Sequence, residues 1–191
     1  MVLTNDEALA RQVKLLSLHG MSAHAWSRFS EQGYRHYDVL CAGFKYNMMD
    51  LQAAIGLHQV KRVQQYFTRR QVIWQRYWEA FAHLPVQLPA PLEPGTVHGR
   101  HLFTLLVEPA HSPVTRDAFI AALHQRKIGT GGHYRAIPVH PYNQERYGWR
   151  PEAYPHAHAI GQATVSLPLS AKLTDADVDD VIQAVCHTLQ A

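Results

Sequence analysis

A long helical pattern between residues 49 and 84 constrains the fold of this chain more than any other feature of the sequence. After Gln59, apolar and aromatic residues recur at the spacing of one helix face. They are Val63, Tyr66, Phe67, Trp74, Tyr77, Phe81 and Leu84. A helix of about 35 residues is roughly 50 Å long, which is more than a small domain needs. We therefore expect this helix either to break or to reach toward a neighbouring chain or domain.

The aromatic stripe of this helix has two interpretations. It is favoured as the face that packs on a core, because stripes of this kind usually do so. The alternative is a face that contacts a partner subunit. Near the start of the helix, Ala53, Ala54 and Gly56 are small and would allow close packing of another element.

The sequence before the long helix predicts one shorter helix and a long connection. Thr4 or Asn5 can cap this first helix, and Gly20 suits the position just after its end. Its apolar face would consist of Leu9, Val13 and Leu16. Residues 1–3 look like the end of a strand whose beginning is missing, which suggests a fragment. Residues 21–46 have weak periodicity, and we expect a largely irregular connection there.

A segment with four prolines, residues 85–95, predicts the start of a second unit. We expect a strand over 101–107, a helix capped by Thr115 and ending near Gly129, a short strand around His133 and a loop from Pro138 to Pro155. An alternating strand over 165–169 and a helix beginning at Thr174 follow. Residues 96–191 therefore predict a small α+β domain with helices on one face of a short sheet.

Composition narrows the class of protein. Hydrophobic residues make up 47% of the chain and charged residues 17%, which is typical of a globular protein. The net charge is +3 without a run of five basic residues, so we do not expect nucleic-acid binding. The sequence has no secretory signal pattern and no apolar run long enough to span a membrane. We therefore expect a soluble cytoplasmic protein without a membrane partner.

Common self-contained catalytic motifs are missing from the sequence: it has no P-loop, no dinucleotide-binding glycine pattern, no nucleophile elbow and no zincin helix. Four histidines, His133, His140, His156 and His158, raise the question of a metal. Their spacing does not place them on one helix face, and no acidic or thiol ligand clusters with them. We therefore expect no metal site.

Two segments could bind a ligand. The glycine-rich turn 129–132 precedes His133 and Tyr134, although the same glycines could simply end a helix. Lys45 and Asn47 lie just before the long helix, where a phosphate would meet the helix N-terminus and a positive charge. The alternative is that Asn47 caps the helix and Lys45 is solvated.

Residues 43–57 (GFKYNMMDLQAAIGL) resemble a sequence block of the DegT/StrS-type sugar aminotransferases, which depend on pyridoxal 5'-phosphate (PLP) and aminate nucleotide-linked keto-sugars. Residues 2–20 resemble the stretch that follows the family's glycine-rich turn. Further matches occur in the family's order at Arg69–Arg70, Tyr77, His101–Phe103, 127–134, His140–Pro141 and 166–169. The matches cover nearly the whole chain and are most similar to the branch that aminates 4-keto sugars.

The resemblance implies an α/β protein, the C-terminal part of PLP-dependent fold type I. Residues 1–84 would be a remnant of the large PLP-binding domain with the long connecting helix, and residues 85–191 the small α+β domain. The family's Schiff-base lysine precedes the matching region, and none of the chain's five lysines has a matching context. We therefore expect no catalytic residue in this chain and no activity from the chain alone.

The resemblance also assigns binding residues. Lys45 and Asn47 match columns from which one residue reaches the PLP phosphate of the partner subunit in a homodimer. His133 and Tyr134 match a loop that lines the sugar side of the pocket. His24, Trp26 and Arg28 would lie near the nucleotide-sugar. Glutamate would be the amino donor, and the pathway would be polysaccharide or lipopolysaccharide biosynthesis.

Three hypotheses follow for the chain as it stands. It is the product of a truncated or split aminotransferase gene, or of a start codon assigned too late. Alternatively, it is a non-catalytic dimerisation domain, or a sugar-nucleotide binding module that has lost its chemistry. In each case we expect the remnant of the large domain to leave apolar surface exposed and to favour association.

Overall fold

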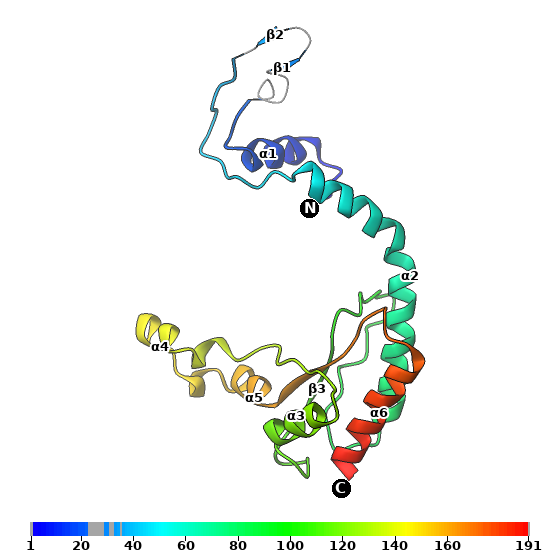
Figure 1. The fold of residues 1–191 in the computed structure, drawn as a ribbon. Helices are drawn as coiled ribbons and strands as arrows, with labels where there is room; N and C mark the ends of the chain where they lie inside the picture. The colour runs from blue at the N-terminus through cyan, green and yellow to red at the C-terminus, as the bar shows by residue number, and fades with distance from the viewer. Residues whose placement is uncertain (1, 23–28, 31–32, 35, 191) are drawn as a thin grey trace. The chain divides into compact units, whose positions relative to one another are not determined.

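The computed structural model describes residues 2–22, 29–30, 33–34 and 36–190 (Figure 1). The chain divides into two compact units, residues 1–61 and 62–191, and the division falls inside the long helix α2 (Asp50–Phe81). α2 is one continuous helix of 32 residues, so the break that we considered does not occur. The boundary expected at residue 84 separates the large and small domains of a complete enzyme. It is a different division from the two compact units and stays a prediction.

The first unit contains helix α1 (Glu7–Ser17), an antiparallel pair of short strands, β1 (Phe29–Ser30) and β2 (Gly33–Tyr34), and the start of α2. Residues 2 and 3 are not in a strand, contrary to the prediction. The N-cap of α1 is Asp6, whose Oδ1 accepts hydrogen bonds from the backbone N–H groups of Ala8 at 2.8 Å and Leu9 at 3.1 Å. The prediction of Thr4 or Asn5 was therefore wrong, because the Thr4 hydroxyl accepts from the backbone of Asp6 instead.

The second unit contains the rest of α2 and a short sheet with its helices. In chain order these are β3 (Phe103–Leu106), α3 (Arg116–Gln125), η2 (Ile137–Val139), α4 (Pro141–Tyr147), η3 (Pro151–Ala153), α5 (Pro155–Ala163), β4 (Thr164–Leu167) and α6 (Asp175–Gln190). β3 and β4 are antiparallel, with Phe103 opposite Leu167 and Leu105 opposite Val165. Gln87 extends the β3 edge and Gly131 the β4 edge through single bridges.

The core of the second unit lies between this sheet and helices α2, α3 and α6. Side chains alternate along a strand, so Phe103 and Leu105 share one face of the sheet with their partners on β4. The ring of Phe103 is met edge-on by Trp74 at 5.1 Å and Tyr77 at 5.2 Å between centroids. Ile73, Trp74, Tyr77 and Phe81 are buried, so the core interpretation of the aromatic stripe is confirmed for the second half of α2.

The first half of α2 does not have a covered apolar face. Within the first unit, Leu51, Ile55, Leu57 and Val60 are between 57% and 69% exposed. The buried hydrophobic residues of the described chain all lie between Ile73 and Leu189, which is to say in the second unit. The first unit therefore has no hydrophobic core of its own among the described residues.

Charged groups fix α6 beside the second half of α2 (Figure 1). Arg69 donates to the carboxylate of Asp175 at 2.8 Å and to the carbonyl oxygen of Leu173 at 2.7 Å. Arg76 donates to Asp175 as well, and to Asp179. Helix α6 begins at the predicted place, directly after Thr174. Its start is a reciprocal cap that was not predicted: the Thr174 hydroxyl accepts from the N–H of Asp177, whose carboxylate accepts from the N–H of Thr174.

Three predictions for the second unit were wrong. The segment around His133 is not a strand, since only Gly131 forms a single bridge, with Ser166. The segment between Pro138 and Pro155 is not a loop, because its prolines stand in the first turns of four short helices. Proline is tolerated there, since it lacks only an N–H that would have no helical partner. Helix α3 begins after its Thr115 cap as predicted, but it ends at Gln125, and Lys127 rather than Gly129 has the positive φ, 62°.

Candidate functional site

The predicted phosphate-binding residues Lys45 and Asn47 lie on an extended segment in the first unit. The backbone N–H of Tyr46 donates to Ser17 at 2.8 Å, and the N–H of His19 donates to the carbonyl of Phe44 at 2.9 Å. Side chains alternate along such a segment, so Phe44 and Tyr46 stack on each other at 5.1 Å. Lys45 and Asn47 share the other side, where Nζ of Lys45 donates to Oδ1 of Asn47.

Two glycines allow this segment to approach the end of α1. A β-carbon at Gly43 would lie 2.2 Å from the backbone nitrogen of Gly20. One at Gly20 would lie 1.9 Å from the carbonyl oxygen of Cys41, and Gly20 also has a φ of +70°. Side chains at these positions would push the segment away from α1, so both glycines support the placement of Lys45 and Asn47.

Asn47 does not cap α2, so one of the alternatives for this residue is wrong. Helix α2 starts at Asp50, and the side-chain oxygen of Gln52 accepts from the backbone N–H of Met49 at 3.0 Å. The amide of Asn47 is instead paired with the exposed ammonium group of Lys45. Together they present nitrogen donors to solvent just before a helix N-terminus, which is a donor set that suits a phosphate.

The second candidate cluster surrounds His133 in the second unit. Nδ1 of His133 lies 2.7 Å from the hydroxyl of Ser166, and the backbone carbonyl of His133 accepts from the hydroxyl of Thr164 at 3.3 Å. Gly131 holds the loop against β4 through two backbone hydrogen bonds with Ser166, of 3.0 and 2.7 Å. The imidazole is half-buried and held by these contacts. The ring of Tyr134 meets it edge-on, and Tyr134 is 75% exposed.

The alternation of β4 explains why hydroxyl groups meet the His133 loop. Val165 and Leu167 face the core, so Thr164 and Ser166 face the opposite side of the sheet. Both are nevertheless buried, at 2% and 4% exposure, because the His133 loop covers them. We predicted a half-buried strand there and assigned no role to either hydroxyl. Two polar residues between the apolar positions of a strand were the signal that could have found them.

The remaining predicted residues are not placed. His24, Trp26 and Arg28 lie outside the residues that the structure describes. Lys45 and Asn47 belong to one compact unit, and His133 and Tyr134 to the other.

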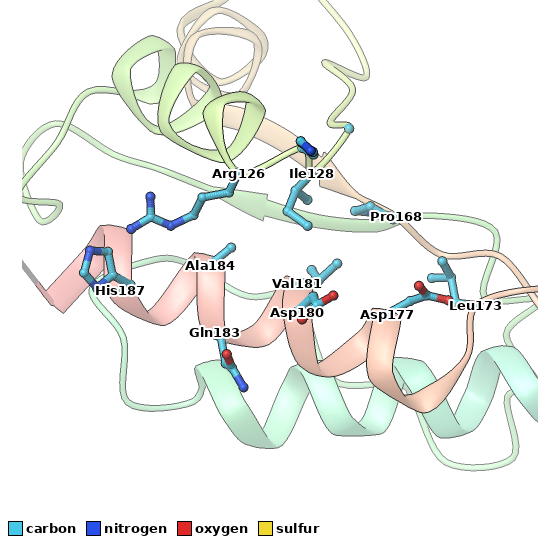
Figure 2. Close-up of a pocket in the computed structure, with 12 residues that line it drawn as sticks. Arg126, Ile128, Pro168, Leu173, Asp177, Asp180, Val181, Gln183, Ala184 and His187 are labelled. Atoms are coloured by element: carbon cyan, nitrogen blue, oxygen red, sulfur yellow. The ribbon is translucent and has the colours of Figure 1, made fainter.

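A groove of about 700 Å³ runs along α6 on another part of the second unit (Figure 2). Arg126 and His187 lie at one end of it, and Leu173 and Asp177 lie at the other. Ile128, Val181 and Ala184 form an apolar floor. None of the predicted site residues that the structure describes lines this groove.

Within the described parts of the chain, no three histidine, cysteine or acidic side chains are grouped closely enough to hold a metal ion. A search of the same residues found no helix with the length and apolar character needed to cross a membrane.

Solved structures define the class of this fold. A putative sugar aminotransferase from Streptococcus pneumoniae, Spr1654, superposes with a TM-score of 0.83 and 29% identity, over 98% of this chain and 44% of that one. It was solved in PMP and PLP forms. DesV of S. venezuelae gives a TM-score of 0.82 at 25% identity, over 99% of this chain and 46% of the other. The chain therefore has the fold of the C-terminal portion of PLP-dependent sugar aminotransferases of fold type I.

Sequence comparison gives the family. Residues 1–186 match the model of the DegT/DnrJ/EryC1/StrS aminotransferase family, and the chain belongs to that family. The spore coat polysaccharide biosynthesis protein SpsC of Bacillus subtilis is 42% identical over 186 residues, which is 97% of this chain and 48% of SpsC. The chain thus spans about half the length of this relative. The family and fold inferred from residues 43–57 and the other blocks are confirmed.

Proposed function

We propose that this chain forms the C-terminal half of a PLP-dependent aminotransferase that transfers an amino group from glutamate to a nucleotide-linked keto-sugar. The match to the sugar aminotransferase family over residues 1–186 is the observation that carries this proposal. The 42% identity to a polysaccharide biosynthesis protein supports a role in making a surface polysaccharide or lipopolysaccharide. The protein would act in the cytoplasm.

Lys45 and Asn47 would hold the phosphate group of PLP. An ammonium group is a positively charged donor, and an amide can donate from its nitrogen, so the two residues suit a phosphate better than a neutral group. Their present contact would open when the phosphate accepts from Lys45. In the proposed homodimer this phosphate would belong to the partner subunit's cofactor. When bound, PLP supplies the electron sink that amino transfer requires.

His133 and Tyr134 would line the sugar side of the pocket. Ser166 engages Nδ1 of the imidazole, which leaves Nε2 as the ring nitrogen for a sugar hydroxyl. The phenol of Tyr134 is exposed and can donate or accept. His24, Trp26 and Arg28 would contact the nucleotide-sugar. None of these residues is assigned a proton-transfer step, and we propose that the chain alone is not catalytically competent.

The exposed apolar surface of the first unit supports a second candidate function, non-catalytic dimerisation. Leu51, Ile55, Leu57 and Val60 lie on a helix with no covering element among the described residues of that unit. Apolar surface of this kind favours association. A module that binds a sugar-nucleotide without chemistry is the remaining alternative, and it would use the His133 loop.

A PLP titration of the full chain tests the cofactor proposal. Absorbance would follow binding, and borohydride reduction with intact-mass analysis would detect a covalent bond to lysine. We expect no covalent adduct, and weaker non-covalent binding in Lys45→Gln than in a Lys172→Gln control. A stoichiometric adduct on one lysine would contradict the proposal that the chain lacks the catalytic lysine.

Amino transfer itself needs a second test. The full chain would be co-expressed with the N-terminal half of SpsC, the half that this chain does not match. Transfer of ¹⁵N from glutamate to a nucleotide-linked 4-keto-hexose would support the enzymatic proposal. A co-purified pair of halves that binds PLP without transferring the label would favour the non-catalytic alternatives.

A further inference from the structure

A cavity of about 340 Å³ lies behind the His133 loop in the second unit. Three basic side chains line it from three different elements: Arg116 from the start of α3, Arg135 from the loop and His158 from α5. Gln162 and Thr164 add polar groups. None of the described residues that line the cavity is acidic, and Asp117, which pairs with Arg116, does not line it.

Two of these basic side chains have buried nitrogens without a hydrogen-bond partner among the described residues: Nε of Arg116 and Nδ1 of His158. Arg116 forms an ion pair with Asp117, whose Oδ1 lies 2.6 Å from Nε, but the contact does not have the geometry of a hydrogen bond. The carboxylate of Asp117 is 85% exposed and faces solvent. A buried polar atom left unpaired destabilises the folded state. Such atoms therefore point to a bound ion, ligand or water.

The guanidinium group of Arg116 lies close to the loop backbone. Its Nη1 is 3.8 Å from the position that a β-carbon would take on Gly132. Gly161 on α5 approaches the same loop, since a β-carbon there would lie 2.7 Å from the nitrogen of Ala136. The two glycines bring α5 and Arg116 against the loop, so the basic groups converge on one space.

We propose that this cavity binds an oxyanion, the phosphate or carboxylate group of a small ligand, between Arg116, Arg135 and His158. Guanidinium groups match the geometry of carboxylate and phosphate oxygens with paired N–H donors. The volume is at the lower end of the range for ligand pockets, so the site suits a small acidic group better than a large ligand. An anion there would also offset the repulsion between the basic groups.

The site adjoins the candidate sugar-binding loop. Thr164 lines the cavity, and its hydroxyl donates to the backbone carbonyl of His133. Gly132, the neighbour of His133 in sequence, also lines it. An occupied cavity would therefore support the loop from behind. The proposal does not depend on amino transfer, because it rests on the cavity and its basic groups alone.

Titration of the full chain with inorganic phosphate and with glutarate tests the site. Sodium chloride at matched ionic strength is the control for general salt effects. Thermal unfolding and the NMR signals of the His158 ring would report binding. We expect both anions to raise Tm and shift the His158 signals, and tighter binding of one would identify phosphate or carboxylate as the preferred group.

Arg116→Gln and Arg135→Gln should each weaken binding by about tenfold, because each removes a charge-assisted hydrogen bond. Arg126→Gln is the matched control, since Arg126 lines the groove along α6 and not this cavity. Arg135 is exposed, so its variant keeps the test valid if Arg116→Gln does not fold. Equal effects of chloride and phosphate, or equal affinities of Arg135→Gln and the unmodified chain, would overturn the proposal.

Discussion

The hydroxyl of Tyr77 lies 3.0 Å from the carbonyl oxygen of Pro168 and donates a hydrogen bond to it. Tyr77 is a buried residue of α2, and Pro168 directly follows β4. The bond therefore ties the long helix to the strand that holds the His133 loop. Burial is the main cause that raises the pKa of Tyr77, with a smaller increase from Asp177 and an opposing effect from Arg76.

Tyr77→Phe should destabilise the second unit. The substitution keeps the ring packed against Phe81 and Phe103 but leaves the half-buried carbonyl of Pro168 without its donor. The expected loss is about 1–2 kcal/mol of unfolding free energy. Urea unfolding measured by tryptophan fluorescence would detect it, because Trp74 and Trp78 lie in the same helix.

Tyr142→Phe is the matched control for this change. Tyr142 is 66% exposed, and its ring contact with Tyr147 does not need the hydroxyl. Its urea midpoint should stay at the value of the unmodified chain. A Tyr77→Phe midpoint equal to that of the control would show that the bond to Pro168 contributes nothing measurable.

The raised pKa of Tyr77 predicts a loss of stability in alkaline solution. In the unfolded chain a tyrosine ionises near its ordinary pKa of about 10, whereas the folded state keeps Tyr77 protonated. The unfolded state then binds fewer protons, so the contribution of Tyr77 is complete below this pH and falls as the pH rises above it. The decrease in urea midpoint between neutral and alkaline pH should be smaller in Tyr77→Phe. Parallel pH profiles would contradict the assignment.

The lowered pKa of Asp175 predicts that the stability of the fold decreases in acid. Its hydrogen bond with Arg69 is the main cause that lowers the pKa of its carboxyl group, and the charges of Arg69 and Arg76 lower it further. A carboxylate of this kind stabilises the fold above its unfolded pKa of about 3.9, and the effect is lost as the pH falls through the lower folded value. Asp175→Asn should therefore be less stable than the unmodified chain at neutral pH, with the difference vanishing in strong acid.

Asp180→Asn is the control for Asp175→Asn, because Asp180 is also exposed in α6 and forms no ion pair among the described residues. Both variants change the net charge equally. Urea midpoints across the acid range would separate the specific effect of Asp175 from the effect of charge. If the urea midpoints of both variants had the same pH profile, the contacts of Asp175 with Arg69 and Arg76 would be exposed to solvent and would not stabilise the fold specifically.

The sequence predicted those parts of the fold in which the spacing of apolar residues follows the buried face of a helix or strand. The stripe through Trp74, Tyr77 and Phe81 predicted a core face because these side chains meet Phe103. The Thr115 cap was predicted because a short hydroxyl side chain has few other roles before a helix. Lys45 and Asn47 were found from the family block, and their mutual contact was not.

Other features depend on contacts that a local pattern does not contain. We predicted a loop from the prolines between 138 and 155, because proline can interrupt a helix. Proline can also stand in the first turn of a helix, and that is its position here. The hydroxyls of Thr164 and Ser166 contact His133, which lies some thirty residues earlier in the chain. The cationic cavity likewise brings together Arg116 and His158, which are far apart in the sequence.

Gly43 and Gly56 provide a matched pair of substitutions for the Lys45–Asn47 segment. Gly43→Ala would place a β-carbon 2.2 Å from the backbone nitrogen of Gly20, so the segment must move away from α1. A β-carbon on Gly56, which is inside α2, would meet no atom within 4 Å apart from the backbone of its own helix turn. Gly56→Ala should therefore stabilise the helix by about 0.5–1 kcal/mol, because alanine loses less backbone entropy on folding.

Amide hydrogen exchange would measure both effects at single residues. In Gly43→Ala, the N–H groups of His19 and Tyr46 should exchange faster, since their acceptors are the carbonyls of Phe44 and Ser17 across the close approach. In Gly56→Ala the same two amides should keep their protection, while those of α2 exchange more slowly. Unchanged exchange at His19 and Tyr46 in Gly43→Ala would mean that the segment carrying Lys45 does not need the close glycine contact.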